Sequence, residues 1–461
     1  MGKLKNPYRD SGNNPIKTGQ ISLTRGVFSS LLVFYFIIFV SGLYSGSPIQ
    51  TLFCTYIAGM CGLGFIYGYD LKNNFLTVQL GILGLLVFTT RVIIGIVHYH
   101  FAMDDTYFQS NTPTFDYLYD FEWMLNWMTE LSDLWQTDGF GSLPTRWFIE
   151  KNTWLMPYQA LLFYLGDHKH FLNITVVNSL HVMLVATLAA RLAYRLGGKH
   201  HAKMVFFIAA LQPFNLFSSV LARDPVGQFF LILGFLVILD QRVSIKGFLL
   251  MLVGVLQMMM LRQIYFIVGM MTIALKLWST NDVGYSINKF YVLLILCGIG
   301  ILSYIFLWDL FIAFYNFGAD RAGMEARSAM TISQSPLGIV KRLVISMTGP
   351  FPWTNMLSPH ITGREFILPA ILQAIYNVSI LMFFFYGVVK NKIDLFSFPN
   401  IYVLVFVFSI MGAGLLGAGH VSYVTVASVL LLAVIPRLNP LYFIITYLVI
   451  FFIDFSVAFI W

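Results

Sequence analysis

The sequence predicts an all-α protein, a polytopic bundle of transmembrane helices with two long extracytoplasmic loops. Of its 461 residues, 58% are hydrophobic and only 11% are charged, whereas a soluble domain carries roughly 25% charged residues. The apolar residues also fall into repeated runs near the length of about 20 residues that a helix needs to cross a bilayer. The formal charge of +7 therefore bears on orientation in a membrane, and we expect no nucleic-acid partner.

The apolar runs predict about 13 spans, with an error of one or two, several of them short enough to border a cavity. The runs are 27–44, 49–67, 75–97, 171–190, 204–221, 226–239, 247–260, 264–278, 290–311, 366–389, 401–416, 421–435 and 442–460. A further apolar run, 154–165, is too short to span and is interpreted as an extracytoplasmic half-helix.

Cations in short loops predict the orientation, because cytoplasmic loops are enriched in Lys and Arg. Alternation of the spans places the cations of the N-terminal tail and of the later short loops on one side, which we take as the cytoplasm. These residues are Lys3, Lys5, Arg9, Lys17, Arg25, Lys72, Arg191, Arg195, Lys199, Lys203, Arg242, Lys246, Lys276, Lys289, Lys390, Lys392 and Arg437. The first span has no cleavage signal and is interpreted as an uncleaved anchor.

Two long segments fall on the opposite side, and the first is acidic while the second is rich in cations. The predicted division is a cytoplasmic tail (1–26), the first three helices (27–97), an acidic and aromatic loop (98–152), a central bundle (153–311), a second loop (312–365) and C-terminal helices (366–461). Apolar residues from Leu118 to Trp135 recur at helical spacing in the first loop. We expect an amphipathic helix lying on the outer leaflet, or alternatively one that packs on the second loop.

Asp104 and Asp105 follow the third span closely and are candidate catalytic residues. A carboxylate at the outer headgroup level can deprotonate or orient an acceptor hydroxyl, or hold a divalent cation that bridges phosphates. The alternative is a solvated pair or a helix cap, and nothing in the sequence separates the two acids.

Arg223 and Asp224 lie between two apolar runs, where charge is expensive unless it faces a polar site. The planar guanidinium of Arg223 suits a lipid phosphate, and Asp224 can orient that group or act on substrate. The alternative is a structural ion pair at an interhelical turn, with Pro225 at the first position of the next helix.

Five other basic positions are candidates for binding a lipid phosphate. Arg262 separates two apolar runs, and Arg91 lies inside one, nearer its outer end; both need an anion or a polar cavity, although either can extend its charge to the headgroups. Lys341 and Arg342 precede the stiff turn 349–353 and can hold a pyrophosphate or anionic headgroups. His420 ends a glycine-rich span and can titrate or donate to phosphate, or be purely structural.

Several chemistries are excluded or left open by the motifs. The chain has no Walker loop, dinucleotide fingerprint, CxxC pair or HExxH, so nothing indicates a nucleotide-driven pump or a redox centre. Its three cysteines, Cys54, Cys61 and Cys297, lie in apolar runs and are expected to be thiols buried in lipid, not disulfides or metal ligands. No cofactor is required by the sequence, and a divalent cation is compatible with it.

The stretch from Tyr158 to Leu239 resembles the middle of GT-C-type membrane glycosyltransferases and of Wzy-like surface polysaccharide polymerases. The matching residues are the run 158–167, the run 177–180, the basic turn 191–203 and the segment 212–225, in which Arg223-Asp224 follows Pro213 and Ser218-Ser219. Arg262 and Pro350–Trp353 are similar to later features of that pattern. One departure is that the outer acid follows the third span here, not the first.

The resemblance implies a GT-C-like fold and sugar transfer from a polyprenyl-phosphate or polyprenyl-pyrophosphate donor to a glycan acceptor at the extracytoplasmic face. It implies O-antigen, capsule or exopolysaccharide assembly in a bacterial inner membrane, as the polymerase or as a branch-adding transferase, with membrane lipids and other assembly proteins as partners. The competing class is a transporter or flippase for a lipid-linked or anionic substrate, which would show charge and broken helices at the midplane. A non-catalytic assembly scaffold is a third alternative.

Overall fold

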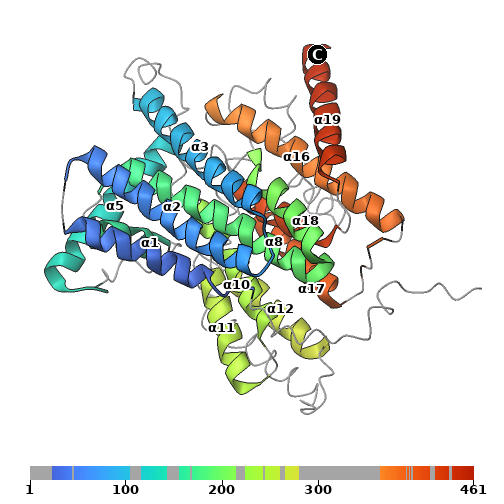
Figure 1. Ribbon diagram of the computed structural model, residues 1–461, viewed down its shortest axis with the longest axis horizontal. Coiled ribbons are helices and arrows are strands. Elements are labelled where there is room, and N and C mark those ends of the chain that lie inside the picture. The colour runs from blue at the N-terminus through green and yellow to red at the C-terminus, as the bar shows by residue number, and fades with distance from the viewer. Residues whose placement is uncertain are drawn as a thin grey trace, which may run out of the picture.

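The computed structural model describes residues 23–43, 46–103, 116–142, 155–166, 169–213, 224–241, 244–259, 265–279, 364–390, 392–393, 395, 398–415, 421–435 and 439–460. All regular secondary structure in these residues is helical (Figure 1). The helices are α1 (Val27–Gly42), α2 (Pro48–Lys72), α3 (Val78–Met103), α5 (Asp116–Asp138), α7 (Leu155–Gly166), α8 (Phe171–Ala210), α10 (Asp224–Asp240), α11 (Ile245–Met259), α12 (Tyr265–Ser279), α16 (Arg364–Val389), α17 (Phe398–Leu415), α18 (Val421–Val434) and α19 (Pro440–Ile460).

The all-helical prediction is confirmed for the described residues, and the helices follow the apolar runs closely. The predicted span 290–311 lies outside the described residues. Within the described residues, four helical segments are long and apolar enough to cross a membrane, namely Pro48–Lys72, Val78–Val97, Leu172–Ala210 and Leu372–Val389. The other apolar helices are shorter, so the membrane character of the chain is supported, while the number of spans stays a prediction.

Helix α8 joins two predicted spans across a break. The runs 171–190 and 204–221 were expected to be separated by a basic turn, and the helix is interrupted by non-helical backbone at Gly198, with φ 82° and ψ −170°. That left-handed φ favours glycine because a Cβ atom would strain it. Beyond the break α8 ends at Ala210, and Pro213 explains the stop because proline cannot continue a helix.

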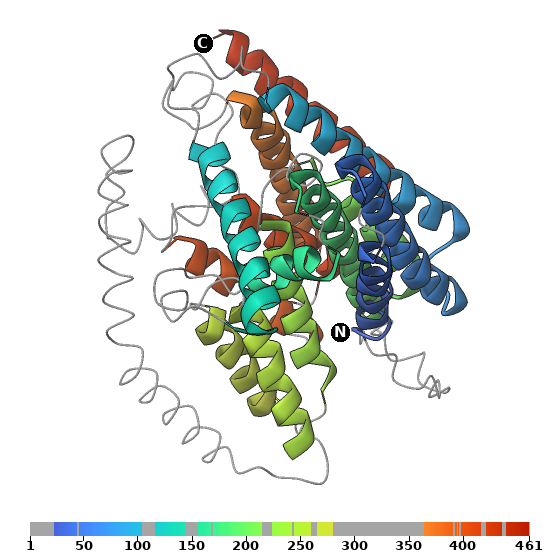
Figure 2. The ribbon, with the colours of Figure 1, turned by 90° about the vertical axis from the view of Figure 1, so that its left-hand side faces the viewer.

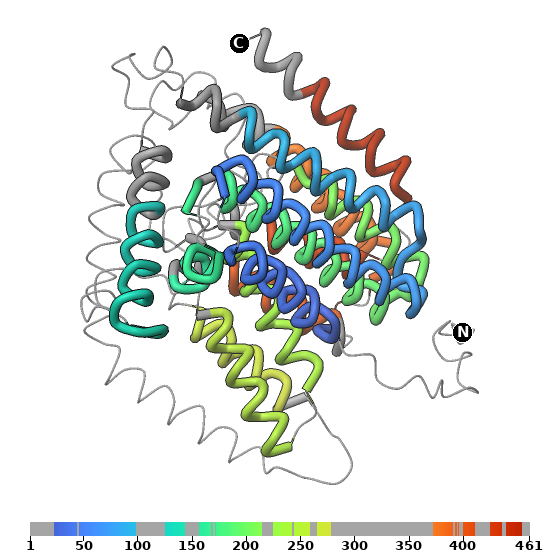
Figure 3. The backbone as a smooth tube through the Cα atoms, turned by 60° about the vertical axis from the view of Figure 1, so that its left-hand side comes forward, coloured from blue at the N-terminus to red at the C-terminus, as the bar shows by residue number. Residues whose placement is uncertain are grey.

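Helix α8 is also the centre of the bundle (Figure 1). It packs against α2, α3, α10 and α18, and it is almost entirely buried along its apolar length. By contrast, α19 packs only on α16 among its stronger contacts, lies at the edge of the molecule in Figure 3 and exposes many large apolar side chains. Polar side chains of α8 therefore lie deep inside the protein, and the outer helices expose an apolar surface suited to contact with lipid.

The predicted amphipathic helix of the first long loop exists as α5, but its apolar stripe packs on protein. Met128, Leu131 and Trp135 are almost fully buried, and α5 packs against α7 at the side of the bundle (Figure 2). Trp135 makes an edge contact with Tyr164 of α7. Burial against α7, the expected half-helix, therefore accounts for the stripe. A lipid leaflet is not needed to cover it, and the second loop lies outside the described residues.

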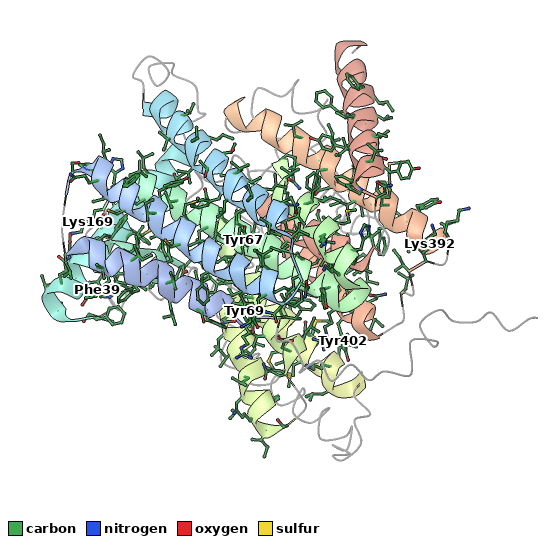
Figure 4. All side chains as sticks on the ribbon, viewed as in Figure 1. Phe39, Tyr67, Tyr69, Lys169, Lys392 and Tyr402 are labelled. Carbon is green, nitrogen blue, oxygen red and sulfur yellow. The ribbon has the colours of Figure 1, made fainter. Side chains whose placement is uncertain are left out.

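Contacts between distant segments gather several helix ends at one end of the bundle. Residues just before α1, the last turn of α2, the part of α8 before Gly198, the end of α10 and the end of α12 are joined by hydrogen bonds and ion pairs. We call this the charged end. Figure 4 shows Tyr69 near this end and Lys169 near the opposite one. Consecutive helices joined by short connections alternate in direction, so the remaining ends of α1, α2 and α10 to α12 lie away from the charged end.

Candidate functional site

Most of the predicted site residues border described helices without being described themselves. Asp104, Asp105, Arg223, Arg262, Lys341, Arg342 and His420 lie outside the described residues. Asp224 is the first residue of α10, so only its backbone position is known. Arg91 is the predicted site residue whose side chain the structure describes.

The described helix ends show how these positions relate along the fold. Helix α3 ends at Met103, next to Asp104, and α10 begins at Asp224, next to Arg223. Arg262 falls between the end of α11 and the start of α12, and His420 directly precedes α18. All of these helix ends lie away from the charged end. For α3 and for α10 to α12 this follows because consecutive helices alternate in direction. For α18 it follows because His201 is hydrogen-bonded to the Ala433 carbonyl, at the opposite end of that helix from His420.

Arg91 lies midway along α3 and is completely buried. The sequence placed it nearer the outer end of its apolar run, and the difference arises because α3 continues to Met103. Its Nη2 atom donates a hydrogen bond of 2.5 Å to the carbonyl oxygen of Ala210, the last residue of α8. A guanidinium buried among apolar helices needs a polar partner, and the end of α8 supplies one.

Further polar groups from α16 and α18 surround the same helix end. The Tyr376 hydroxyl donates to the Ile208 carbonyl at 2.9 Å, and Gln212 Nε2 donates to the Thr425 carbonyl at 3.2 Å. We call Arg91, Gln212, Tyr376, Asn377 and Ser428 the Arg91 cluster. All five are buried, and those on α3, α16 and α18 lie near the middle of their helices.

The α16–α18 side of this cluster is held by an amide. Asn377 Oδ1 accepts from Gln373 Nε2 at 2.8 Å and from Ser428 Oγ at 2.6 Å. These contacts satisfy polar side chains that would otherwise be costly in an apolar interior. Gln373, Asn377 and Ser428 were not among the residues predicted to form a site. The available signal was the spacing of Gln373 and Asn377, four residues apart inside an apolar run and therefore on one helix face.

A second buried polar pair joins α7 to α8. The Tyr158 hydroxyl and His181 Nε2 are 2.7 Å apart, and His181 Nδ1 is 2.7 Å from the Val177 carbonyl. A carbonyl oxygen only accepts, so Nδ1 carries the proton and the Tyr158 hydroxyl donates to Nε2. Edge contacts from Phe229 and Phe230 of α10 pack on this pair. Both ring nitrogens of His181 are thus hydrogen-bonded, as in a core histidine that needs no ligand.

The charged end contains a buried ion pair that the sequence analysis missed. Arg191 Nη2 and Nε contact one carboxylate oxygen of Asp70 at 2.6 and 3.1 Å, and each side chain is only 1% exposed. Arg191 Nη1 also donates to the carbonyls of Leu23 and Arg25. The prediction that Arg191 lies in a short loop is wrong, because it belongs to α8 and is enclosed by α2 and the segment before α1.

Asp240 and Lys276 make further hydrogen bonds at the charged end. Asp240 accepts from the Leu23 N–H at 2.5 Å and from Arg195 at 3.3 Å. Lys276, also predicted to face the cytoplasm from a short loop, is buried in α12 and donates to the carbonyls of Ile238, Leu239 and Gln241. A cation at the last carbonyls of α10 is favourable because the C-terminal end of a helix carries partial negative charge. Arg191, Arg195 and Lys276 therefore join the ends of neighbouring helices through hydrogen bonds.

Within the described part of the chain, His, Cys, Asp and Glu side chains form no group of three or more that could hold a metal ion, while Asp104 and Asp105 lie outside it. Searches against protein-family models, curated proteins and solved structures found no match.

Proposed function

We propose that this protein is an integral membrane glycosyltransferase that acts at the extracytoplasmic face. It transfers a sugar or an oligosaccharide repeat from a polyprenyl-phosphate or polyprenyl-pyrophosphate donor to a glycan acceptor, in assembly of a surface polysaccharide. The observation behind this proposal is that five of the candidate positions, Asp104, Arg223, Asp224, Arg262 and His420, lie at or next to helix ends on one side of the bundle, away from the charged end. Cations predominate at the charged end, which we assign to the cytoplasm by the positive-inside rule.

The reaction proposed for this side needs a base that activates the acceptor hydroxyl and cations that bind the donor phosphate. The bond between the sugar C1 and the donor phosphate oxygen breaks, and C1 forms a bond to an acceptor hydroxyl oxygen. Asp104 or Asp105 takes the hydroxyl proton or orients that hydroxyl, as a general base does. Arg223 and Arg262 hold the phosphate that leaves with the electron pair, aided by Lys341, Arg342 or His420, and Asp224 orients Arg223 or contacts substrate.

The site-directed test compares glycan output from cells that make Asp104→Asn, Asp105→Asn or Arg223→Ala. Loss of a general base lowers rates by roughly 10²–10⁴-fold, so we expect one of the two acidic variants, and Arg223→Ala, to abolish most output. Lys246→Ala is the matched control, because Lys246 is an exposed cation near the charged end. If all three variants reach the membrane in normal amounts and keep full output, the site assignment is wrong.

A transporter or flippase for a lipid-linked or anionic substrate is the second candidate function. It is favoured by one observation, the position of buried Arg91 midway along α3 at the end of the broken helix α8. Charge beside an interrupted helix at the midplane is typical of substrate sites in transporters. Its test is transbilayer movement of a polyprenyl-linked sugar in vesicles that contain the purified protein. Movement without sugar transfer would favour transport over glycosyl transfer.

A further inference from the structure

Three side-chain donors hold the end of α8, one from α3, one from α16 and one, Gln212, from just past the helix end. Arg91 donates to the Ala210 carbonyl at 2.5 Å, and Tyr376 donates to the Ile208 carbonyl at 2.9 Å. Gln212, just past the end of α8, binds the Thr425 carbonyl of α18 at 3.2 Å. The last carbonyls of any helix lack partners within that helix. Here two of them receive donors from neighbouring helices.

The depth of this helix end makes those donors important. After the break at Gly198, α8 continues only to Ala210, a rise of roughly 18 Å at 1.5 Å per residue. That is less than the hydrocarbon thickness of about 30 Å, so the helix ends partway across the bundle, where the carbonyls of Ile208 and Ala210 accept from neighbouring helices. The positive charge of Arg91 adds to the hydrogen bond, because helix C-terminal ends attract cations.

The chain after this anchored end leads directly to the candidate site. Pro213 closes the described stretch that begins with α8, and Asp224 opens α10. Helix α10 packs on α8, on α11 and on α18. Helix α10 is therefore held in the bundle by its own packing, and Arg91 and Tyr376 hold the end of α8 in the same bundle.

We propose that Arg91, together with Tyr376, is a positioning residue that sets the end of α8 relative to the first turn of α10, where Asp224 lies. This differs from the sequence-based expectation that Arg91 binds a substrate phosphate directly. The inference rests on the proposed function only for what Asp224 and its neighbour Arg223 do. The anchoring of α8 itself does not depend on it.

A distance measurement tests the anchoring without any turnover. Spin labels are placed at Leu211, which is 39% exposed at the end of α8, and at Ile245, which is 86% exposed at the start of α11, in a chain whose Cys54, Cys61 and Cys297 are replaced. We expect Arg91→Met to broaden or shift the 211–245 distance distribution and Arg91→Lys to restore most of it. Tyr376→Phe, which removes no charge, should move it in the same direction.

A second label pair distinguishes local from general loosening. Labels at Ile49, which is 79% exposed at the start of α2, and at Ile245 should keep their distance distribution in every variant. An unchanged 211–245 distribution in both Arg91→Met and Tyr376→Phe would overturn the proposal. So would equal broadening of both pairs, because Arg91 would then stabilise the bundle in general.

Glycan output gives the functional readout. Loss of a hydrogen bond from a charged donor corresponds to roughly tenfold or more, so we expect Arg91→Met to lower output by that order and Arg91→Lys to rescue it. If output falls while the 211–245 distribution stays unchanged, Arg91 acts on substrate and positioning is contradicted. If the distribution changes as expected but the chain has no effect on glycan, the proposed function fails and the anchoring stands.

Discussion

The contact between Asp70 and Arg191 is a buried charge pair in which each partner depends on the other. Removing one member of such a pair leaves an uncompensated charge and costs about 3–5 kcal/mol. We therefore expect Asp70→Leu and Arg191→Met each to lower the unfolding temperature in detergent sharply. The double variant Asp70→Leu/Arg191→Met should be less destabilised than either single variant, although the Leu23 and Arg25 carbonyls still lose their donor.

A surface ion pair serves as the control. Asp133 contacts Lys169, and their side chains are 53% and 26% exposed; exposed ion pairs contribute about 1 kcal/mol or less. Asp133→Asn should therefore have a small effect. Additive losses in the Asp70/Arg191 double variant would show that the two side chains act independently and would contradict the coupling.

His170 at the start of α8 predicts a pH dependence. Partial burial disfavours its charged form and holds the pKa of His170 below the ordinary 6.5, and its Nδ1 accepts from the Leu172 N–H at 3.2 Å. The unfolded chain binds this proton at higher pH than the folded chain. Neutral His170, which caps the N-terminus of α8, thus stabilises the fold above pH 6.5, and this contribution falls as the pH drops below that value.

The matched variant for this cap is His170→Asn, whose side-chain oxygen can cap a helix without titrating. Between about pH 7 and pH 5, thermal unfolding should shift downward more in the parent protein than in His170→Asn. Equal shifts would mean that His170 does not contribute to the acid sensitivity of the fold.

At the scale of elements, α10 and α11 approach each other closely at two glycines. A Cβ atom added at Gly234 would lie 2.3 Å from the Gly254 carbonyl oxygen, and one added at Gly254 would lie 2.7 Å from that of Gly234. Small residues allow such close backbone approach. We expect Gly234→Ala and Gly254→Ala each to destabilise the bundle by about 1–3 kcal/mol, as overpacking does.

Gly64 and Gly68 of α2 provide the comparison, because an added Cβ atom at either has nothing within 4 Å. Ala there should be neutral or slightly stabilising, since Ala favours a helix over Gly. Unfolding temperatures of the four variants decide the matter. A Gly254→Ala protein as stable as Gly68→Ala would show that α10 and α11 do not pack this closely.

The positions of the helices were predictable from sequence because apolar runs record which segments are withdrawn from water. The runs 226–239 and 421–435 match α10 and α18 within a few residues. The end of α8 at Ala210 was not predictable, since the apolar run continues to residue 221. Hydropathy does not register the proline at 213 or the donors on other helices. The apolar stripe of α5 was predicted, but its burial against α7 was not, because that contact depends on tertiary packing.

The polar interior was the least predictable part. Asp70 and Arg191 lie far apart in the sequence, and the sequence around each one predicts only a charged residue near a loop. Their pairing depends on how α2 crosses α8. Arg91 was identified as a buried charge that needs a partner, yet its partner is a backbone carbonyl, which no side-chain pattern reveals. The role expected for Arg91 therefore changes from phosphate binding to helix anchoring in the proposal above.

For the whole molecule, the account predicts which side each end faces. Single cysteines at Thr137, exposed on α5, and at Lys246, exposed next to the charged end, report the two sides in a chain otherwise free of cysteine. A membrane-impermeant maleimide should label Thr137→Cys in intact cells and Lys246→Cys only after permeabilisation. The reverse pattern would place Asp104 and Arg223 on the cytoplasmic side and would exclude an extracytoplasmic reaction.

The most direct test of the central claim is the surface glycan profile, resolved by length, of cells with and without this protein. Glycosyl transfer predicts a changed profile. Collapse of a long ladder to a single-repeat band would identify a polymerase, and an intact ladder whose every rung shifts in mass would identify a branch-adding transferase. A profile unchanged in both ladder and mass would contradict glycosyl transfer to surface polysaccharide and would leave transport of another substrate as the better account.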